Sequence, residues 1–279
     1  VWSDVDGNGY PDLYIAKCRQ NVTDATDPRR INQLFLNNGD GTYTQDTLNT
    51  SGLRIGAQSW SADFGDLDND GDMDCFLTNH DLSSQLLEND GAGHFTDITV
   101  QAGLFDQVAG IPTQGVFRDF DNDGFVDILV AGDRHFIFRN NGNKTFTALP
   151  NPFGKKQMES FAVGDLNSDG FVDIYGGYAK LFNDPVGSIV PDALWINEGN
   201  SNHYLGLNLR GIQSNRSAVG ARVLLYSALG VQVREVRAGE SYGISNSLQV
   251  LFGLGQATQI DSIVVRWPSG ARDQLSQPS

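Results

Sequence analysis

Short apolar runs, separated by turns rich in glycine and aspartate, dominate residues 1–202. The run Ile128-Leu129-Val130-Ala131 is rich in branched side chains and bounded by Asp and Gly, as buried inner strands are. Asn-Asn-Gly at 37–39 and 140–142, and Asn-Asp-Gly at 89–91, supply residues that tolerate the positive φ of hairpin turns. No stretch shows the 3.6-residue periodicity of an amphipathic helix. The pattern predicts an all-β protein.

One unit recurs four times, as WSDVDGNGYPDLYIA, FGDLDNDGDMDCFLT, FRDFDNDGFVDILVA and VGDLNSDGFVDIYGG. A second element follows each unit: QLFLNNGDGTYT, QLLENDGAGHFT, FIFRNNGNKTFT and ALWINEGNSNHY. Repeats of about 50 residues hold about four short strands, which is the size of a propeller blade. We therefore predict a β-propeller in residues 1–202 with four blades' worth of sequence. Since Val1 falls inside a repeat, the propeller is expected to be incomplete at its N-terminus.

The pattern changes at about residue 203. Residues 203–279 carry seven Arg, no Lys and four acidic residues, whereas the preceding part is strongly acidic. Apolar residues alternate with polar ones around 205–209, 223–225, 231–233 and 263–267, which favours longer antiparallel strands. Ala228-Leu229-Gly230 fits a hairpin turn. We predict a second, small antiparallel β domain over residues 203–279.

The aspartates of each repeat follow the pattern D-x-[DN]-x-[DN]-G-x-x-D. Alternate side chains at positions 1, 3, 5 and 9 can converge on one centre, glycine at position 6 permits a sharp reversal, and position 7 can offer its carbonyl. The predicted side-chain ligands are Asp4, Asp6, Asn8 and Asp12 in loop 1 (residues 4–12), Asp66, Asp68, Asp70 and Asp74 in loop 2 (66–74), Asp119, Asp121, Asp123 and Asp127 in loop 3 (119–127), and Asp165, Asn167, Asp169 and Asp173 in loop 4 (165–173). The carbonyl ligands are those of Tyr10, Asp72, Phe125 and Phe171, with the Asp72 carboxylate expected to point outward.

Calcium is the cation that this donor set favours, because it takes six to eight oxygens in forgiving geometry. The chain has 29 Asp and only 5 Glu, a bias toward loops and oxygen-ligand sites. An EF-hand is excluded, because position 12 of each loop is Ile15, Leu77, Val130 or Gly176 instead of Glu. The alternative of a solvated acidic face does not explain four loops in register. We predict up to four Ca²⁺ ions.

The net charge of −15 argues against nucleic acid and anionic membrane surfaces as partners. Membrane insertion is also not expected, because the chain has no apolar run of eighteen residues. The two cysteines, Cys18 and Cys75, do not form a disulfide scaffold, and whether they are bridged is left open.

The four loops, with N-N-G-x-G-x-[FY] downstream, resemble the FG-GAP/VCBS repeats of integrin-α-like β-propellers. The segments SNRSAVGARVLLY and AGESYGISNSLQVLFGLGQATQIDSIVVRWPSG resemble the ASPIC/UnbV domain. This arrangement is that of the cartilage acidic protein-like family and its bacterial relatives. The resemblance implies a calcium loop between the first two strands of each blade. It also implies an extracellular protein, secreted or at the cell surface, and periplasmic or on the outer surface if bacterial.

No catalytic constellation is predicted. Gly239-Glu240-Ser241-Tyr242-Gly243 has the spacing of a nucleophile elbow, but it lies among predicted strands and no His follows His203. His80, His94, His135 and His203 lack metal-binding spacing. The interpretation is a binding module for an extracellular protein or glycan, of adhesion or matrix type, with part of a secreted carbohydrate-processing enzyme as the alternative.

The sequence also predicts residues of the core and of the partner-binding surface. Trp2, Phe64 and Phe117 precede their loops at matching positions, with Val163 in the fourth repeat, and are expected in the core between blades. The segment 17–33, which is long and polar, is the expected partner-contacting insertion.

Overall fold

The chain is described by a computed structural model for residues 1–108, 110–154, 158–178 and 191–278, and all its regular elements are β-strands. The prediction of an all-β fold is confirmed. Within these ranges, nothing helical has the length and hydropathy needed to span a bilayer.

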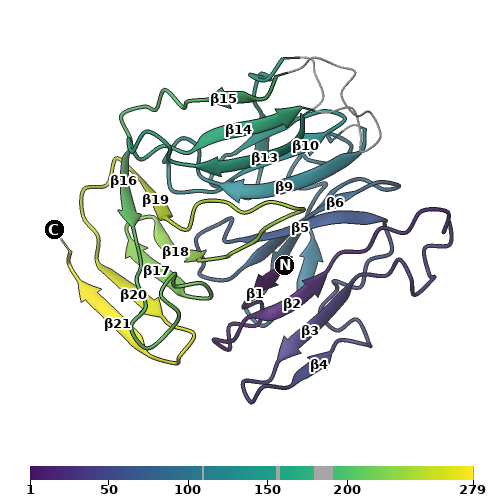
Figure 1. Cartoon of the computed structure of the whole chain (residues 1–279), viewed down its shortest axis with the longest axis horizontal. Helices are drawn as coiled ribbons and strands as arrows, with labels where there is room; N and C mark the ends of the chain where they lie inside the picture. The colour runs from purple at the N-terminus through teal and green to yellow at the C-terminus, as the bar shows by residue number, and fades with distance from the viewer. Residues whose placement is uncertain (109, 155–157, 179–190, 279) are drawn as a thin grey trace.

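The described residues form four propeller blades, fanned one above the other from blade 1 to blade 4 (Figure 1). Each blade is an antiparallel meander whose strands follow chain order. The strands are β1 (Trp2–Ser3), β2 (Asp12–Ile15), β3 (Gln33–Asn37) and β4 (Tyr43–Gln45) in blade 1; β5 (Ser59–Gly65), β6 (Asp74–Asn79), β7 (Gln85–Asn89) and β8 (Phe95–Asp97) in blade 2; β9 (Pro112–Arg118), β10 (Asp127–Gly132), β11 (Phe136–Asn140) and β12 (Phe146–Ala148) in blade 3; and β13 (Met158–Gly164), β14 (Asp173–Tyr178) and β15 (Ala193–Trp195) in blade 4.

The hydrophobic cores lie between blades, because successive side chains of a strand point to opposite faces of its sheet. In β6, Cys75 and Leu77 pack in one cluster with Tyr14 of blade 1, whereas Phe76 packs in another with Ile128 of blade 3. A third cluster joins blades 3 and 4. Burial on both faces explains why the second strands of blades 2 and 3, β6 and β10, carry apolar residues in succession, whereas β2 and β14 also have exposed side chains.

The predicted inter-blade aromatics are confirmed at two positions and wrong at one. Phe64 and Phe117 are 1% and 3% exposed within these clusters, and Val163 is 5% exposed at the matching place. Trp2 is 48% exposed. The reason is geometric: this position faces the preceding blade, and blade 1 has no preceding blade among the described residues.

The C-terminal strands form two further sheets, of four and two strands. Strands β17 (Arg222–Ser227), β18 (Gly230–Glu235), β20 (Ser262–Arg266) and β21 (Arg272–Ser276) pair in the order β18-β17-β20-β21. Ser227 pairs with Gly230, which confirms the hairpin turn at 228–230. Strand β16 (His203–Leu207) leaves the propeller and pairs with β19 (Val250–Gly255).

These C-terminal strands pack directly against the propeller. Leu224, Val233 and Val264 belong to the hydrophobic cluster that joins blades 1 and 2. In the view of Figure 1 the connection from β18 to β19 is seen between β5 and β9, and the backbone N–H of Gly115 in β9 donates to Ser241 Oγ at 3.0 Å. A buried ion pair between Arg237 and Asp63, at 2.8 Å, lies at the same interface.

Candidate metal centres

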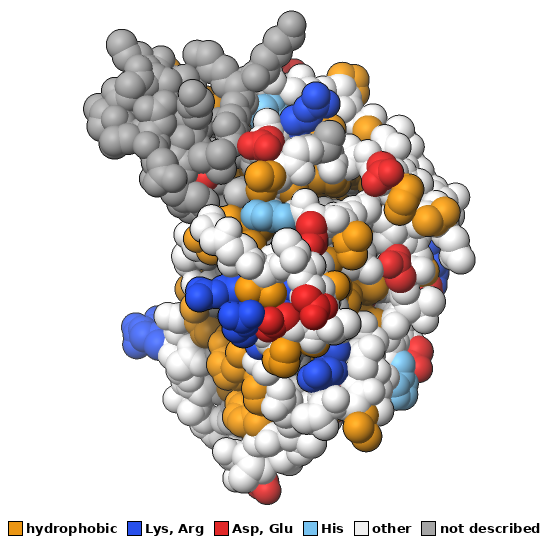
Figure 2. All heavy atoms as spheres, turned by 90° about the vertical axis from the view of Figure 1, so that its right-hand side faces the viewer, with side chains coloured by type: hydrophobic (Ala, Val, Ile, Leu, Met, Phe, Trp, Pro, Cys, Tyr) orange, Lys and Arg blue, Asp and Glu red, His pale blue; other side chains and the backbone are white. Residues whose placement is uncertain are grey.

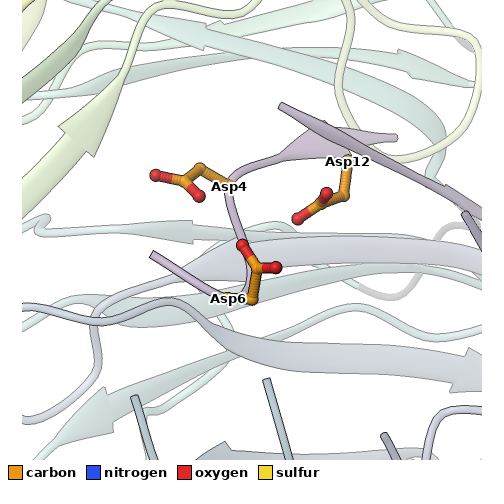
Figure 3. A group of neighbouring side chains, drawn as sticks. All are labelled: Asp4, Asp6 and Asp12. Atoms are coloured by element: carbon orange, nitrogen blue, oxygen red, sulfur yellow. The ribbon is translucent and has the colours of Figure 1, made fainter. Parts of the chain in front are cut away.

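Three of the four predicted loops bring acidic side chains together. In loop 1, carboxylate oxygens of Asp4, Asp6 and Asp12 all lie within 4.8 Å of one another. Figure 3 shows these three carboxylates directed toward a common space, with Asp12 supplied by the first residue of β2. Loop 3 brings together the same positions, 1, 3 and 9, as Asp119, Asp121 and Asp127, whereas loop 2 brings together positions 1, 3 and 5, as Asp66, Asp68 and Asp70. The predicted ligands Asp74 and Asp123 lie outside these groups. Each of the three groups could hold a metal ion.

Loop 4 is arranged differently in the described structure. The carboxylate of Asp165 accepts the backbone N–H of Asp169 through Oδ1, at 3.1 Å, and that of Gly170 through Oδ2, at 3.0 Å. Asn167 donates from Nδ2 to Asp169 Oδ2 at 2.7 Å. Its acidic side chains therefore bond within the loop, and they form no converging group of three among the described residues.

The first aspartate of loops 1–3 carries the clearest sign of a cation site. Asp4, Asp66 and Asp119 are 4%, 0% and 6% exposed. In each of them Oδ1 is buried and has no hydrogen-bond partner among the described residues, although Oδ2 is hydrogen-bonded. A buried carboxylate oxygen without a partner is costly, so native proteins normally pair it. Three in register, each beside two further carboxylates, fit an oxygen-coordinated cation.

The aspartate at position 9 clamps the backbone in every loop. Asp74 Oδ2 accepts the N–H of Leu67 at 3.0 Å, and its Oδ1 accepts the N–H of Asn89 at 2.9 Å. The same pair of bonds recurs at Asp12, Asp127 and Asp173, with distances from 2.7 to 3.1 Å. This residue joins its loop to the third strand of the blade, so it has a structural role in addition to the predicted one as ligand.

The residue at position 7 packs on the glycine of the blade's Asn-x-Gly turn. A Cβ added to Gly39 would lie 2.6 Å from the Tyr10 ring, so the glycine leaves room for that ring. Phe125 covers Gly142 and Phe171 covers Gly199 in the same way. In loop 2 the residue is Asp72, whose Oδ1 is buried and has no partner among the described residues. The expectation that the Asp72 carboxylate points outward is therefore wrong.

Burial also perturbs the ionisation of these carboxylates. It raises the pKa of Asp66 to about 7, and Asp68 and Asp70 add to the rise, although Arg234 opposes it. Burial likewise raises the pKa of Asp119, Asp12 and Asp72 to about 7. The ionised clusters are thus unfavourable without a compensating positive charge, and a bound cation supplies such a charge.

A set of asparagines holds neighbouring loops in register, and the sequence analysis gave them only a turn role. Asn89 Nδ2 donates to the carbonyl of Val5 in the preceding loop at 2.8 Å, and to that of Met73 in its own loop at 3.1 Å. Asn140 and Asn197 repeat this pattern, bonding the carbonyls of Leu67 and Phe120 in the preceding loops at 2.8 Å. The recurrence of Asn-x-Gly after each third strand was the available signal.

Comparison with known proteins defines the class of protein. The FG-GAP-like repeat family matches residues 4–77, 66–130 and 119–176, and the ASPIC and UnbV family matches residues 211–279. The repeat matches cover more than half of the chain, so the chain belongs to the FG-GAP-like repeat proteins, with an ASPIC/UnbV domain at its C-terminus. Both resemblances noted in the sequence are confirmed.

Other comparisons add little detail. A search of curated proteins gave no match. Among solved structures, the chain is similar to the V. cholerae biofilm matrix protein Bap1, with 12% sequence identity and a TM-score of 0.28. The match covers 95% of this chain and 58% of that one, so this chain spans less than two thirds of that protein's length.

Proposed function

We propose that the chain is a calcium-binding propeller module that serves adhesion- or matrix-type binding of a protein or glycan in the extracellular space. FG-GAP-like repeats and the ASPIC/UnbV domain together suggest an extracellular β-rich module of this kind. The observation that carries the calcium part of the proposal is the buried, unpartnered Oδ1 oxygen of Asp4, Asp66 and Asp119 in the described structure. The role proposed is binding, not catalysis.

Every donor at the three centres is an oxygen, which disfavours cations that prefer nitrogen or sulfur ligands. Calcium suits the loops better than magnesium, because each loop offers about five protein oxygens, whereas magnesium usually keeps several waters. The residues that would hold it are the aspartates at positions 1, 3, 5 and 9, Asn8 in loop 1, and the carbonyls at position 7. The ion's contribution would be structural: it would offset the repulsion between clustered carboxylates and fix the loop from which each second strand begins. Loop 4 is proposed as a fourth, weaker centre, since both oxygens of Asp165 already accept backbone N–H groups.

The face that remains for a partner lies on the side of the propeller opposite the metal loops. The C-terminal strands contact the metal-loop side, for example where Val233 meets Asp66. The insertion 17–33 projects from the other side, seen at the right of Figure 1 and facing the reader in Figure 2. Figure 2 shows Lys, Arg, Asp and Glu side chains grouped near the middle of this face.

The insertion is well organised. The guanidinium of Arg30, which is 1% exposed, donates from Nη1 to the carbonyls of Val22 and Thr23 at 3.0 and 3.1 Å, and pairs with Asp81 of blade 2. Arg29, next to it, exposes 64% of its side chain. An ordered loop that presents charged side chains suits recognition, because less conformational entropy is lost on binding.

The test is a binding screen on arrays of glycans and matrix proteins, in millimolar calcium and in calcium-free buffer. We expect calcium-dependent binding, and we expect the double variant Arg19→Glu/Arg29→Glu to lose it. The matched control is Arg266→Glu/Arg272→Glu on β20 and β21, away from the insertion, which should bind as the natural chain does. Loss of binding in the control pair alone would overturn the assignment of the face.

A further inference from the structure

Strand β18 of the C-terminal domain lies against loop 2 much as a neighbouring strand would. The backbone N–H of Val231 donates to the carbonyl of Asn69 at 2.9 Å, and Val231 forms a parallel bridge with Asp70. Two residues further on, the N–H of Val233 donates to Asp66 Oδ2 at 2.9 Å. Because alternate N–H groups of a strand point the same way, one edge of β18 faces the loop.

Loop 2 differs from the other loops in what holds the second oxygen of its first aspartate. Elsewhere the glycine at position 6 donates to this oxygen: Gly9 to Asp4 at 3.1 Å, Gly124 to Asp119 at 2.9 Å and Gly170 to Asp165 at 3.0 Å. In loop 2, the donor among the described residues is Val233. A contact that is internal to the other loops is therefore supplied here by the C-terminal domain.

The two carboxylate oxygens of Asp66 consequently have different surroundings. Its carboxylate offers one oxygen to the group formed with Asp68 and Asp70, and its buried Oδ1 has no hydrogen-bond partner in the described structure. Its Oδ2 accepts from Val233, and the whole residue is 0% exposed. A cation bound by this carboxylate would hold it in one orientation, and so would fix Oδ2 as the acceptor of the Val233 N–H.

Arg222 strengthens the link between the C-terminal domain and the loops. From β17, its Nη2 donates to the carbonyl of Gly71 in loop 2 at 3.0 Å, and its Nη1 donates to the carbonyl of Asp4 in loop 1 at 2.9 Å. Its side chain is 7% exposed. Arg222 thus joins the C-terminal domain to both loop 1 and loop 2. A change in the conformation of loop 2 would therefore alter contacts of both β17 and β18.

We propose that cation binding to loop 2 and docking of the C-terminal domain are thermodynamically coupled, with Asp66 as the shared residue. This inference rests on the proposed calcium function. Coupling is reciprocal: a cation in loop 2 holds β18 in place, and docked β18 raises the cation affinity of loop 2. The C-terminal domain is then held more tightly on the propeller when calcium is bound in loop 2.

The test uses hydrogen exchange of the full chain, with calcium and in calcium-free buffer, beside calorimetry of calcium binding. We expect calcium to slow exchange of the Val231 and Val233 amides by about fivefold or more, the lower end of usual coupling strengths. The amides of β21, at the far edge of the sheet from β18, serve as the internal reference and should change less. Calcium uptake with unchanged exchange at Val231 and Val233 overturns the coupling, whereas absence of calcium uptake overturns the proposed function.

A matched pair of variants separates loop 2 from a general effect of calcium. Asp70→Asn removes a ligand charge from loop 2 through an exposed side chain and leaves Asp66 and Val233 intact. Asp123→Asn makes the same change at the same position of loop 3. We expect only Asp70→Asn to abolish the calcium-dependent protection of Val231 and Val233. Equal loss in both variants would contradict a specific link through loop 2.

Discussion

The side-chain amide of Asn89 in blade 2 donates a hydrogen bond of 2.8 Å to the backbone carbonyl of Val5 in loop 1 of blade 1. The same amide bonds the carbonyl of Met73 in its own loop, and its Oδ1 accepts the N–H of Gly93 at 3.0 Å. One side chain thus ties together two neighbouring loops and a hairpin turn. The metal loops are therefore parts of a connected edge of the propeller.

Replacing this asparagine tests that connection. Asn89→Ala leaves two buried carbonyls without a donor, so we expect it to lower the free energy of unfolding by about 2–4 kcal/mol. Asn37→Ala is the control, because Asn37 Nδ2 bonds Pro11 and Tyr43 at a partly exposed site that lacks a preceding loop among the described residues. Its cost should be about 1 kcal/mol. Urea unfolding in calcium measures both, and equal costs would contradict the inter-blade role.

The two kinds of aspartate in loop 2 should respond differently to amide substitution. Asp74→Asn places an NH₂ group against one of two backbone N–H donors, at a residue 1% exposed, so we expect a loss of about 2–4 kcal/mol even without metal. Asp70→Asn should leave the free energy of unfolding nearly unchanged in calcium-free buffer. In calcium, it should lower that free energy relative to the natural chain. Unfolding curves of both variants in the two buffers separate the roles. If the metal-free Asp74→Asn variant were as stable as the natural chain, the structural role of Asp74 in holding the loop to β7 would be contradicted.

Lys144 should weaken calcium binding at loop 2. Its Nζ lies 2.5 Å from Asp68 Oδ2 and also pairs with Glu88, and these carboxylates raise the pKa of the amine. A positive charge so close to a ligand repels a cation, although solvent weakens the effect at a side chain 42% exposed. We expect Lys144→Gln to tighten calcium binding by about fivefold at low salt and less at high salt. Calorimetry at two ionic strengths checks this, and weaker binding by the variant would show that Lys144 supports the site.

The metal-free chain should lose stability as the pH rises. Asp12, Asp66 and Asp119 have folded pKa values of about 7, raised by burial from an ordinary value of 3.8. Between these values the folded state binds more protons than the unfolded state, so the free energy of unfolding falls as the pH rises from about 4 to about 7. We expect a higher melting temperature at pH 5 than at pH 8 in calcium-depleted buffer, and a reduced or reversed difference in calcium. A metal-free melting temperature that rises with pH would contradict the burial of these carboxylates.

The sequence predicted the loop geometry, which depends on residues close together in the chain. It did not predict the hydrogen bonds between residues far apart in the chain. The spacing of Asp4, Asp6 and Asp12 is local, so the loop and its converging carboxylates follow from the repeat alone. The bond from Asn89 to Val5 joins residues 84 apart, and the bond from Val233 to Asp66 joins residues 167 apart. No local pattern specifies such pairs. Trp2 was misplaced for a related reason, because its burial depends on a neighbouring blade and not on its own repeat.

Loop 4 shows a second limit of the sequence pattern. Its residues match the ligand pattern as well as those of loop 1, yet Asp165 bonds two backbone N–H groups of its own loop. In loops 1–3, by contrast, Oδ1 of the first aspartate has no hydrogen-bond partner among the described residues. In loops 1 and 2, Arg222 and Val233 of the C-terminal domain bond its Oδ2. The pattern gives the candidate ligands, while packing around the loop decides how they are arranged.

Direct counting of bound calcium tests the central claim. Calorimetric titration of the metal-depleted chain should show at least three calcium ions bound per chain, at loops 1–3, with dissociation constants no weaker than about the millimolar level of extracellular calcium-binding modules. Asp70→Asn should remove one of these ions. A chain that takes up no calcium at millimolar concentration, while remaining folded, would contradict the account.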